Sequence, residues 1–395
     1  MLKNIRLLIV EDNLAEQNTW TRQLEQHNAI ATDSGTFTFG HTFSATKEEA
    51  LKQIEQHDFD AAIVDLGLAN PAGHKDANTN GNDVVLALTK SELAIVVIFT
   101  GQPTDALSIE IRGPKVEVIS KGASDGQGTE AVMKVLTRNA PMILTIRAAE
   151  EVIKKEMASL FHKSIWPRWK LWLDGTENSD AEITAAVSRH LTSHVHATLL
   201  EKGGQKVLAE EWYFVPPIRD GLRTGDLVEE TVGDQATVAI VITPRCDMAG
   251  NPGNKNETYQ LATCQDISAE WNKRLKKRND LLSANPNEDD QKAFTEWKAN
   301  VIKAKESLRS LIQHQNSNLI HFLHQMRMPD GTSKGPYMIR FDKVKSISRD
   351  SEEGRKLATS PRIASVAPEF LPSIVERLGT YFSRIGTPDY SFTDH

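Results

Sequence analysis

The sequence predicts an α/β protein that begins with a doubly wound, five-stranded parallel sheet over residues 1–139 and continues as an α+β region. Short runs that are apolar throughout alternate with helical patterns, and such strands are typical of a parallel sheet covered by helices on both faces. Polar residues stand directly after most of these runs. The composition, 39% hydrophobic and 25% charged, is that of a globular chain, and 395 residues allow two or three domains.

The elements of this first part follow one another regularly. Strands are expected over residues 7–10, 36–43, 61–64, 94–99 and 115–119. Helices are expected over residues 14–27, 46–56, 82–90 and 128–138. This alternation predicts a flavodoxin-like sheet, whose functional residues lie at the carboxyl ends of the strands.

Four of the five strands are followed directly by polar side chains, which are Glu11 and Asp12, Asp65, Thr100 and Lys121. Three carboxylates at one edge of a sheet repel each other, and a hard divalent cation such as Mg²⁺ relieves that repulsion. An aspartate beside such an ion can accept a phosphoryl group as a nucleophile. A lysine and a hydroxyl can stabilise the phosphoryl oxygens.

The segments that carry these residues resemble the receiver domain of two-component response regulators. They are Leu8–Asn13, Ile63–Leu66, Phe99–Gly101 and Ser120–Gly122. The resemblance covers about the first third of the chain, and the motif set is specific when all its members occur together. It implies phosphorylation by a histidine kinase or a phosphotransfer protein, with Mg²⁺ as the cofactor.

The resemblance also implies a role for each residue. Asp65 corresponds to the phosphoacceptor, and Glu11 and Asp12 to the pair of acids that holds the metal. The backbone carbonyl of Gly67 corresponds to a further metal ligand. Thr100 and Lys121 match the family's hydroxyl and lysine.

Three features depart from the family pattern. Val118 stands where an aromatic switch residue is usual, and Gly122 stands where a proline is common. The stretch after Asp65, residues 69–82, is long and rich in Gly and Asn, which is typical of a loop. It is either a surface that partners contact or a tolerated insertion.

Residues 140–174 are predicted to be a helical linker, because apolar residues recur there at helical spacing. This helix either extends the last receiver helix or packs on the second domain. A seam between the two copies of a homodimer is a third interpretation.

Residues 175–395 are predicted to be an α+β effector domain. Strand-like runs broken by Pro and Gly indicate a small antiparallel β-domain. Residues 268–328 read as a helical hairpin, with helices over 268–284 and 289–326. An amphipathic helix over residues 370–385 ends the pattern.

Three features of this half could carry chemistry. Cys246 and Asp247 follow an apolar strand, where they are either a nucleophile or metal site or an ordinary structural pair. His190 and His194 share a helical face but lack the acid of an HExxH motif, so a structural or surface role is expected. The basic run 273–278 is either a nucleic-acid contact or a solvated face.

The charge is uneven along the chain. Residues 1–150 hold 13 basic and 20 acidic residues, whereas residues 151–395 hold 33 of each. Neither half has the basic excess that would itself indicate nucleic-acid binding. Two cysteines exclude a disulfide framework, and no apolar run reaches the ~18 residues of a membrane span, which predicts a cytoplasmic protein without a membrane partner.

These observations predict a response regulator of a two-component phosphorelay, in which Asp65 controls an effector without a helix-turn-helix that acts by protein interaction. One alternative is a receiver-controlled enzyme, a hydrolase or nuclease that uses Cys246 and Asp247. A DNA-binding transcription regulator is less favoured, because no compact basic recognition-helix pattern is present.

Overall fold

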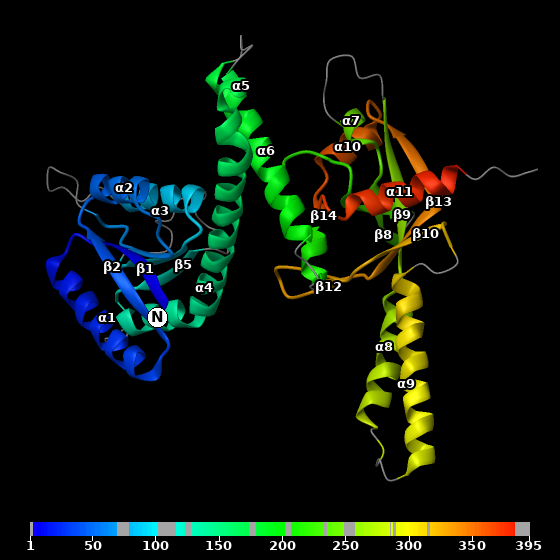
Figure 1. Cartoon of the computed structure of the whole chain (residues 1–395), viewed down its shortest axis with the longest axis horizontal. Helices are drawn as coiled ribbons and strands as arrows, with labels where there is room; N and C mark the ends of the chain where they lie inside the picture. The colour runs from blue at the N-terminus through cyan, green and yellow to red at the C-terminus, as the bar shows by residue number, and fades with distance from the viewer. Residues whose placement is uncertain are drawn as a thin grey trace, which may run out of the picture. The chain divides into compact units, whose positions relative to one another are not determined.

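The structure is a computed structural model of the chain. It describes residues 3–68, 79–101, 116–122, 128–173, 179–201, 207–232, 235–248, 257–284, 286, 290–313 and 317–383. The chain forms two compact units, Met1–Gly204 and Gln205–His395 (Figure 1). Of the helices within the described ranges, none combines the length and the apolar character needed to cross a membrane.

The first unit is built on a five-stranded sheet in the order β2-β1-β3-β4-β5, and all its strands are parallel. The strands are β1 (Lys3–Val10), β2 (Phe37–Ser44), β3 (Ala61–Val64), β4 (Ile95–Thr100) and β5 (Val116–Ser120). This order places β1 and β3 side by side, with β4 next to β3. The predicted doubly wound sheet is therefore confirmed.

Helices cover both faces of this sheet (Figure 1). They are α1 (Leu14–Ser34), α2 (Lys47–Gln56), α3 (Thr79–Ser91) and α4 (Gly128–Leu160). Alternate residues of β1 point to opposite faces: Leu7 packs in a core with residues of α1 and α4, and Leu8 in a core with residues of α2 and α3. Strands that are buried on both sides explain the apolar runs in the sequence.

Helix α4 continues without a break through residue 140, where the sequence pattern separated the receiver from a linker. Its first half packs in the sheet core, and Pro141 lies inside it. Short turns over residues 161–168 and α5 (Trp169–Leu173) follow, and α6 (Asp180–Glu201) packs on α4. Part of the apolar stripe of α4, including Ile146 and Val152, remains exposed.

The second unit holds a seven-stranded antiparallel sheet in the order β10-β13-β9-β8-β7-β14-β6. The strands of this sheet are β6 (Tyr213–Phe214), β7 (Asp226–Val232), β8 (Gln235–Val241), β9 (Thr258–Asp266), β10 (Ile320–Leu323), β13 (Tyr337–Ser348) and β14 (Arg362–Val366). A two-stranded ribbon pairs β11 (Met326–Arg327) with β12 (Ser333–Lys334). The predicted antiparallel β-domain is present.

The helices of the second unit are α7 (Arg245–Met248), α8 (Ser268–Ser283), α9 (Gln291–Ile312), α10 (Glu352–Thr359) and α11 (Leu371–Phe382). Helices α8 and α9 pack together as the predicted hairpin. The predicted extent of the second hairpin helix, to residue 326, is wrong, because α9 ends at Ile312. Residues 320–323 instead pair with β13, where their apolar side chains complete the sheet.

Candidate functional site

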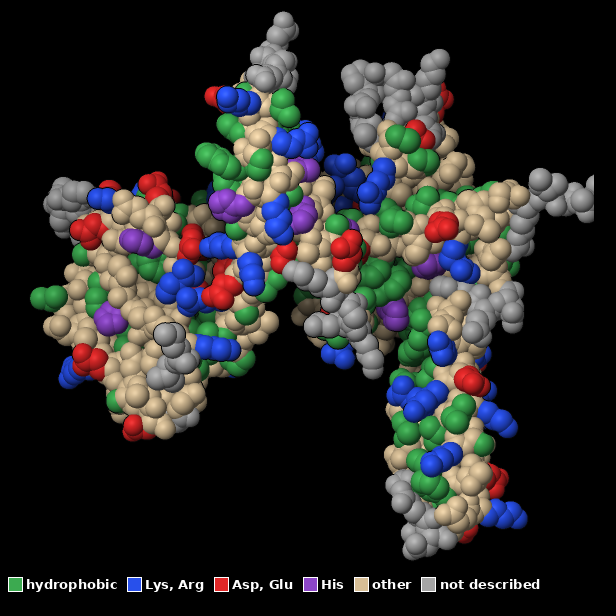
Figure 2. Space-filling model, viewed as in Figure 1, with side chains coloured by type: hydrophobic (Ala, Val, Ile, Leu, Met, Phe, Trp, Pro, Cys, Tyr) green, Lys and Arg blue, Asp and Glu red, His purple; other side chains and the backbone are tan. Residues whose placement is uncertain are grey.

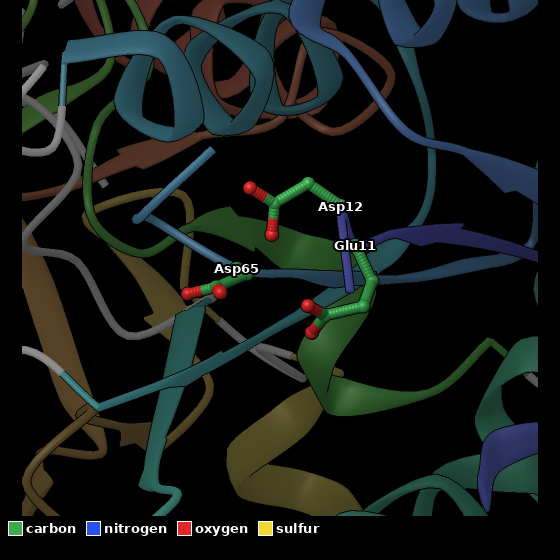
Figure 3. A group of neighbouring side chains, drawn as sticks. All are labelled: Glu11, Asp12 and Asp65. Atoms are coloured by element: carbon green, nitrogen blue, oxygen red, sulfur yellow. The ribbon is translucent and has the colours of Figure 1, made fainter. Parts of the chain in front are cut away.

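Three carboxylates meet at the carboxyl ends of the first unit's strands. Glu11 and Asp12 directly follow β1, and Asp65 directly follows β3. One oxygen from each side chain can be chosen so that all three lie within 4.8 Å of one another. Figure 3 shows these carboxylates around a common space. Glu11 and Asp65 are buried, whereas Asp12 is partly exposed.

Lys121, directly after β5, brings a positive charge to this group. Its Nζ lies 2.6 Å from Oε2 of Glu11 and 2.8 Å from Oδ2 of Asp65. Burial alone would lower the pKa of Lys121, but its hydrogen bonds to Asp65 and Glu11 outweigh burial and raise the pKa. The lysine therefore stays charged at neutral pH.

Glu11 has an unusual environment for a carboxylate. Burial raises its pKa, and the charge of Asp65 adds to that rise, while the hydrogen bond and charge of Lys121 oppose it. Ionising a buried carboxylate costs free energy, and a nearby cation lowers that cost because it stabilises the charged form. The site therefore favours a positively charged ligand.

Two backbone contacts position Asp65. The N–H of Gly67 donates a hydrogen bond to Oδ1 of Asp65, 3.1 Å away. Gly81 in α3 lies so close to the strand end that a Cβ there would stand 2.5 Å from the carbonyl oxygen of Asp65 and 2.5 Å from Cα of Leu66. Sequence analysis missed Gly81, because the predicted loop placed it outside a helix.

Thr100 ends β4, where it is paired with Ser120 of β5 and is buried. The N–H of Lys121 donates to the carbonyl oxygen of Thr100 at 2.9 Å. Because β4 lies between β3 and β5, the strand order places Thr100 at the same edge as Asp65 and Lys121. The structure thus brings the predicted residues to one rim of the sheet.

The donor set fits Mg²⁺. With all three acids ionised, the three carboxylates and one ammonium carry a net charge of −2, which a divalent cation balances. Hard oxygen ligands of this kind suit Mg²⁺. The predicted ligand role of the Gly67 carbonyl stays a prediction.

All three departures from the family pattern lie wholly or partly within the described residues. Val118 lies in β5 and packs partly buried against the core under α2 and α3. Residues 69–78 of the long stretch lie outside the described residues, and residues 79–82 belong to α3. The proposed partner surface over 69–82 therefore stays a prediction.

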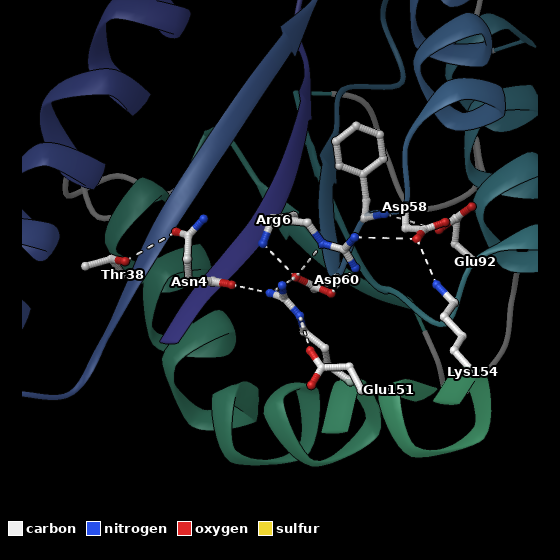
Figure 4. A network of polar contacts seen from close by, with 10 residues as sticks. Asn4, Arg6, Thr38, Asp58, Asp60, Glu92, Glu151 and Lys154 are labelled. Atoms are coloured by element: carbon white, nitrogen blue, oxygen red, sulfur yellow. Dashed lines mark hydrogen bonds and ion pairs between the residues drawn. The ribbon is translucent and has the colours of Figure 1, made fainter. Parts of the chain in front are cut away.

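A second polar cluster lies at the amino-terminal side of the sheet, and sequence analysis missed it (Figure 4). The buried Asp60 pairs with Arg6 at 2.7 Å and with Arg147 of α4 at 3.4 Å. Lys154, further along α4, pairs with Asp58 at 3.2 Å. These contacts tie the middle of α4 to the sheet. Nothing in the sequence pattern pairs residues so far apart in the chain.

The candidate residues of the second half do not assemble into a comparable site. Cys246 is exposed on α7, with its Sγ 3.6 Å from Oδ1 of Asp247. His190 is exposed and lies against the ring of Trp172. Within the described residues, neither the cysteine nor a histidine belongs to a group of three side chains that could hold a metal ion.

No protein-family model matches the sequence, and no curated protein matches it. Several solved structures are similar to parts of it. One is the N-terminal domain of a response regulator/sensory box/GGDEF three-domain protein from Carboxydothermus hydrogenoformans, with 20% identity, 37% of this chain and 98% of that chain covered, and a TM-score of 0.26.

Two further structures are response regulators. The protein from Burkholderia pseudomallei, with a phosphorylated aspartic acid, calcium and citrate, has 21% identity over 51% of this chain and 99% of that chain, with a TM-score of 0.26. The protein from Thermotoga maritima in complex with Mg²⁺ and BeF has 18% identity over 33% of this chain and 99% of that chain, with a TM-score of 0.23.

The fold of the first unit is assigned from its strand order and not from these structures, whose TM-scores are low. A parallel sheet ordered 2-1-3-4-5 is the doubly wound arrangement found in CheY and flavodoxin. The first unit has a receiver-type fold. In this receiver-type unit, the three carboxylates lie where the fold rule places function, outside the carboxyl ends of the strands.

Proposed function

We propose that this chain is a phosphorylation-regulated response regulator of a two-component phosphorelay. Asp65 accepts a phosphoryl group from a histidine kinase or a phosphotransfer protein, and Glu11, Asp12 and Asp65 hold Mg²⁺. The observation that carries the proposal is the meeting of these three carboxylates within 4.8 Å, with Lys121 bonded to two of them. Mg²⁺, when bound, neutralises charge on the phosphoryl oxygens.

The chain's own residues prepare Asp65 for in-line attack. An oxygen of Asp65 forms a bond to phosphorus while the bond from phosphorus to the donor's imidazole nitrogen breaks, and that nitrogen keeps the electron pair. The N–H of Gly67 holds Oδ1 of Asp65, and Lys121 stands at Oδ2. The Lys121 ammonium can turn from the carboxylate to the charged oxygens of the transferred group.

Helix α4 is the proposed route by which the signal leaves the site. Val118 has no ring to swing behind Thr100, so the usual aromatic relay does not apply. Gly128, the first residue of α4, lies close to the carboxyl ends of β4 and β5. A Cβ at Gly128 would stand 2.9 Å from the ring of Phe99 and 3.4 Å from the carbonyl oxygen of Ser120. These contacts support a route from the neighbourhood of Thr100 and Lys121 to α4.

We propose that the second unit is an effector that acts by protein interaction. Apolar side chains are exposed on its helices, including Leu282 of α8, Ile302 of α9, and Val375 and Phe382 of α11. Exposed apolar side chains that form a contiguous patch are typical of surfaces that bind partners. Both cysteines carry free thiols, which favours the cytoplasm as the place where the protein works.

Phosphorylation of the purified chain tests the proposal. Incubation with acetyl phosphate and Mg²⁺ should add one phosphoryl group to the intact mass, and Asp65→Asn should remove that addition. Asp33→Asn, at an exposed position of α1, is the matched control. Equal labelling of all three proteins would overturn the assignment of Asp65.

Hydrogen exchange tests the route through α4. With beryllofluoride and Mg²⁺ bound, exchange should change over residues 102–112 and 128–160. Changes that stop before residue 128 would show that the receiver-type unit is not coupled to its long helix.

Nucleic acid is a second candidate partner of the effector, because the hairpin of α8 and α9 is positively charged. Helices α8 and α9 together carry ten basic and four acidic residues, a net charge of +6. Figure 2 shows Lys and Arg side chains along the hairpin, with few acidic ones between them. Such a surface binds phosphates, and affinity for duplex DNA should then fall steeply with salt. Lys276→Gln/Lys277→Gln should weaken that binding, whereas unchanged binding would remove this candidate.

A further inference from the structure

The second unit contains a cavity of about 570 Å³ that the receiver chemistry does not use. It is lined by residues from β6, from the segment that leads into β7, from α7 and from the end of β14. Those that the argument uses are Phe214, Ile218, Arg219, Arg223, Arg245 and Val366. Its volume falls within the range of roughly 300–1,000 Å³ that is typical of small-molecule sites.

The cavity has an excess of positive charge. Arg219, Arg223 and Arg245 line it, and within the described ranges none of the three guanidinium groups forms an ion pair with a carboxylate. Asp226 also lines the cavity, but it is wholly buried and committed to other partners. Arginine presents several donors in a planar group, which matches phosphate oxygens better than any other side chain does.

Asp226 is bonded on both its oxygens. Its Oδ2 accepts from Arg362 at 3.2 Å and from the N–H of Arg223 at 2.7 Å. Its Oδ1 accepts from the hydroxyl of Ser365 at 2.5 Å. The Asp226 carboxylate therefore holds the cavity wall in place through these hydrogen bonds. It is not paired with the guanidinium groups of the three cavity arginines, which can contact an anion.

The same network holds the backbone of the arginine segment. Arg362 donates to the carbonyl oxygens of Arg219 and Gly221, the latter at 2.8 Å. Thr224 donates to the carbonyl oxygen of Thr243 at 2.6 Å. Because none of these contacts uses the side chain of Arg219, Arg223 or Arg245, the arginine side chains can be replaced without removing the segment's anchors. A site whose backbone is already ordered loses less entropy on binding.

One wall of the cavity is apolar. Phe214 exposes 39% of its surface and Ile218 exposes 74%, although both are large apolar side chains. Val366 and Met248 lie beside the same space. A ligand that covers this wall must carry a flat or apolar body, and one that satisfies the arginines must carry charged oxygens.

We propose that this cavity binds a phosphate-bearing nucleotide, with its phosphates on the three arginines and its base against Phe214 and Ile218. Cys246 and Asp247 do not line the cavity, although their neighbours Arg245 and Met248 do. The proposal is therefore a binding site, and it assigns no reaction to the cysteine. It rests on residues of the second unit alone and stands apart from the phosphorylation of Asp65.

Titration calorimetry with ATP and GTP tests the proposal on the full chain. Arg223→Gln/Arg245→Gln should weaken binding by about tenfold or more, because two charge-assisted contacts to phosphate are lost. Arg355→Gln, at an exposed position of α10, is the matched control, and it should bind as the parent chain does. Phe214→Ala provides a second variant that leaves every arginine in place, and it should also weaken binding.

Three results would overturn the proposal. The first is that neither nucleotide binds at concentrations up to ~1 mM. The second is binding that the cavity variants leave unchanged, or inorganic phosphate binding as tightly as the nucleotides. The third is that a single-stranded oligonucleotide binds through the same arginines while ATP and GTP do not, which would make the cavity part of a nucleic-acid surface.

Discussion

The two units both gather charge at one place on a sheet, but they do so in opposite ways. In the first, Glu11, Asp12 and Asp65 directly follow adjacent parallel strands, and Lys121 balances only part of their charge. In the second, three arginines gather around a cavity, and one buried carboxylate, Asp226, holds the wall behind them.

The two architectures form their sites in different ways. Parallel strands bring their carboxyl ends to the same edge, so residues that follow different strands meet without further support. Antiparallel strands alternate in direction, so their site depends on a loop that must be held in place. The first site should therefore be sensitive to changes at its ligands, and the second to changes in the network behind it.

The largest effect is expected from removing the carboxylate behind the arginine cavity. Asp226→Ala leaves Arg362 largely buried without its partner, and it should lower the free energy of unfolding of the second unit by about 3–5 kcal/mol. Chemical denaturation followed by circular dichroism measures this change. Asp342→Ala, which breaks a more exposed pair with Arg340, should cost less than about 1 kcal/mol. Equal costs would show that the network does not support the cavity.

The next largest effect is expected at Gly81, which lies close to the backbone of Asp65 and Leu66. In an ordinary helix Gly→Ala stabilises by about 1 kcal/mol, but Gly81→Ala places a methyl group against the backbone of Asp65 and Leu66. We expect a net loss of about 1–3 kcal/mol, together with slower phosphorylation. Gly122→Ala is the control, because its Cβ would meet only Ser120 Oγ, at 3.7 Å. A stabilised Gly81→Ala protein would contradict this packing.

Removal of one metal ligand should have a smaller effect on free energy. Asp12→Ala lowers both the charge and the ligand count of the site, so Mg²⁺ should bind about tenfold more weakly or worse. Titration calorimetry with Mg²⁺ measures the affinity, with Asp33→Ala as the control. Unchanged affinity in Asp12→Ala would place the cation elsewhere.

The pH dependence of Mg²⁺ binding follows from Glu11. Burial raises the pKa of Glu11, and a protonated carboxyl group cannot serve as a ligand. The affinity for Mg²⁺ should therefore be highest above the raised pKa of Glu11 and should decline as the pH falls through that pKa. The decline should begin at a pH above about 4.3, the pKa of an ordinary glutamate. In Glu11→Gln this decline should be reduced, and an identical pH profile would argue against Glu11 as a ligand.

The smallest effect is expected at the contacts that tie α4 to the sheet. Arg147→Ala leaves the buried Asp60 with Arg6 as a partner, so the cost should be about 1 kcal/mol. Lys154→Ala removes an exposed pair with Asp58 and should cost less than about 0.5 kcal/mol. If α4 carries the signal, Arg147→Ala should also reduce the beryllofluoride-dependent change in hydrogen exchange over residues 144–160.

The strands and the site of the first unit could be predicted from the sequence. Its strands are apolar on both faces, so Ala61–Val64 and its neighbours could be recognised from residue type alone. The predicted site residues could be placed at one rim because the strands are parallel. The sequence did not reveal Gly81 or the pairing of Arg147 with Asp60, since both depend on contacts between segments that are far apart in the chain.

Important features of the second unit depend on contacts between segments that are distant in the sequence. Residues 320–323 read as the end of a helix, and only their pairing with β13 makes them a strand. The three cavity arginines look like ordinary surface residues in the sequence, because Asp226 and Arg362 hold the segment of Arg219 and Arg223, and Arg245 comes from α7. Parallel strands bring distant residues together by a rule of topology, whereas a loop site is defined only by the particular side chains that fold it.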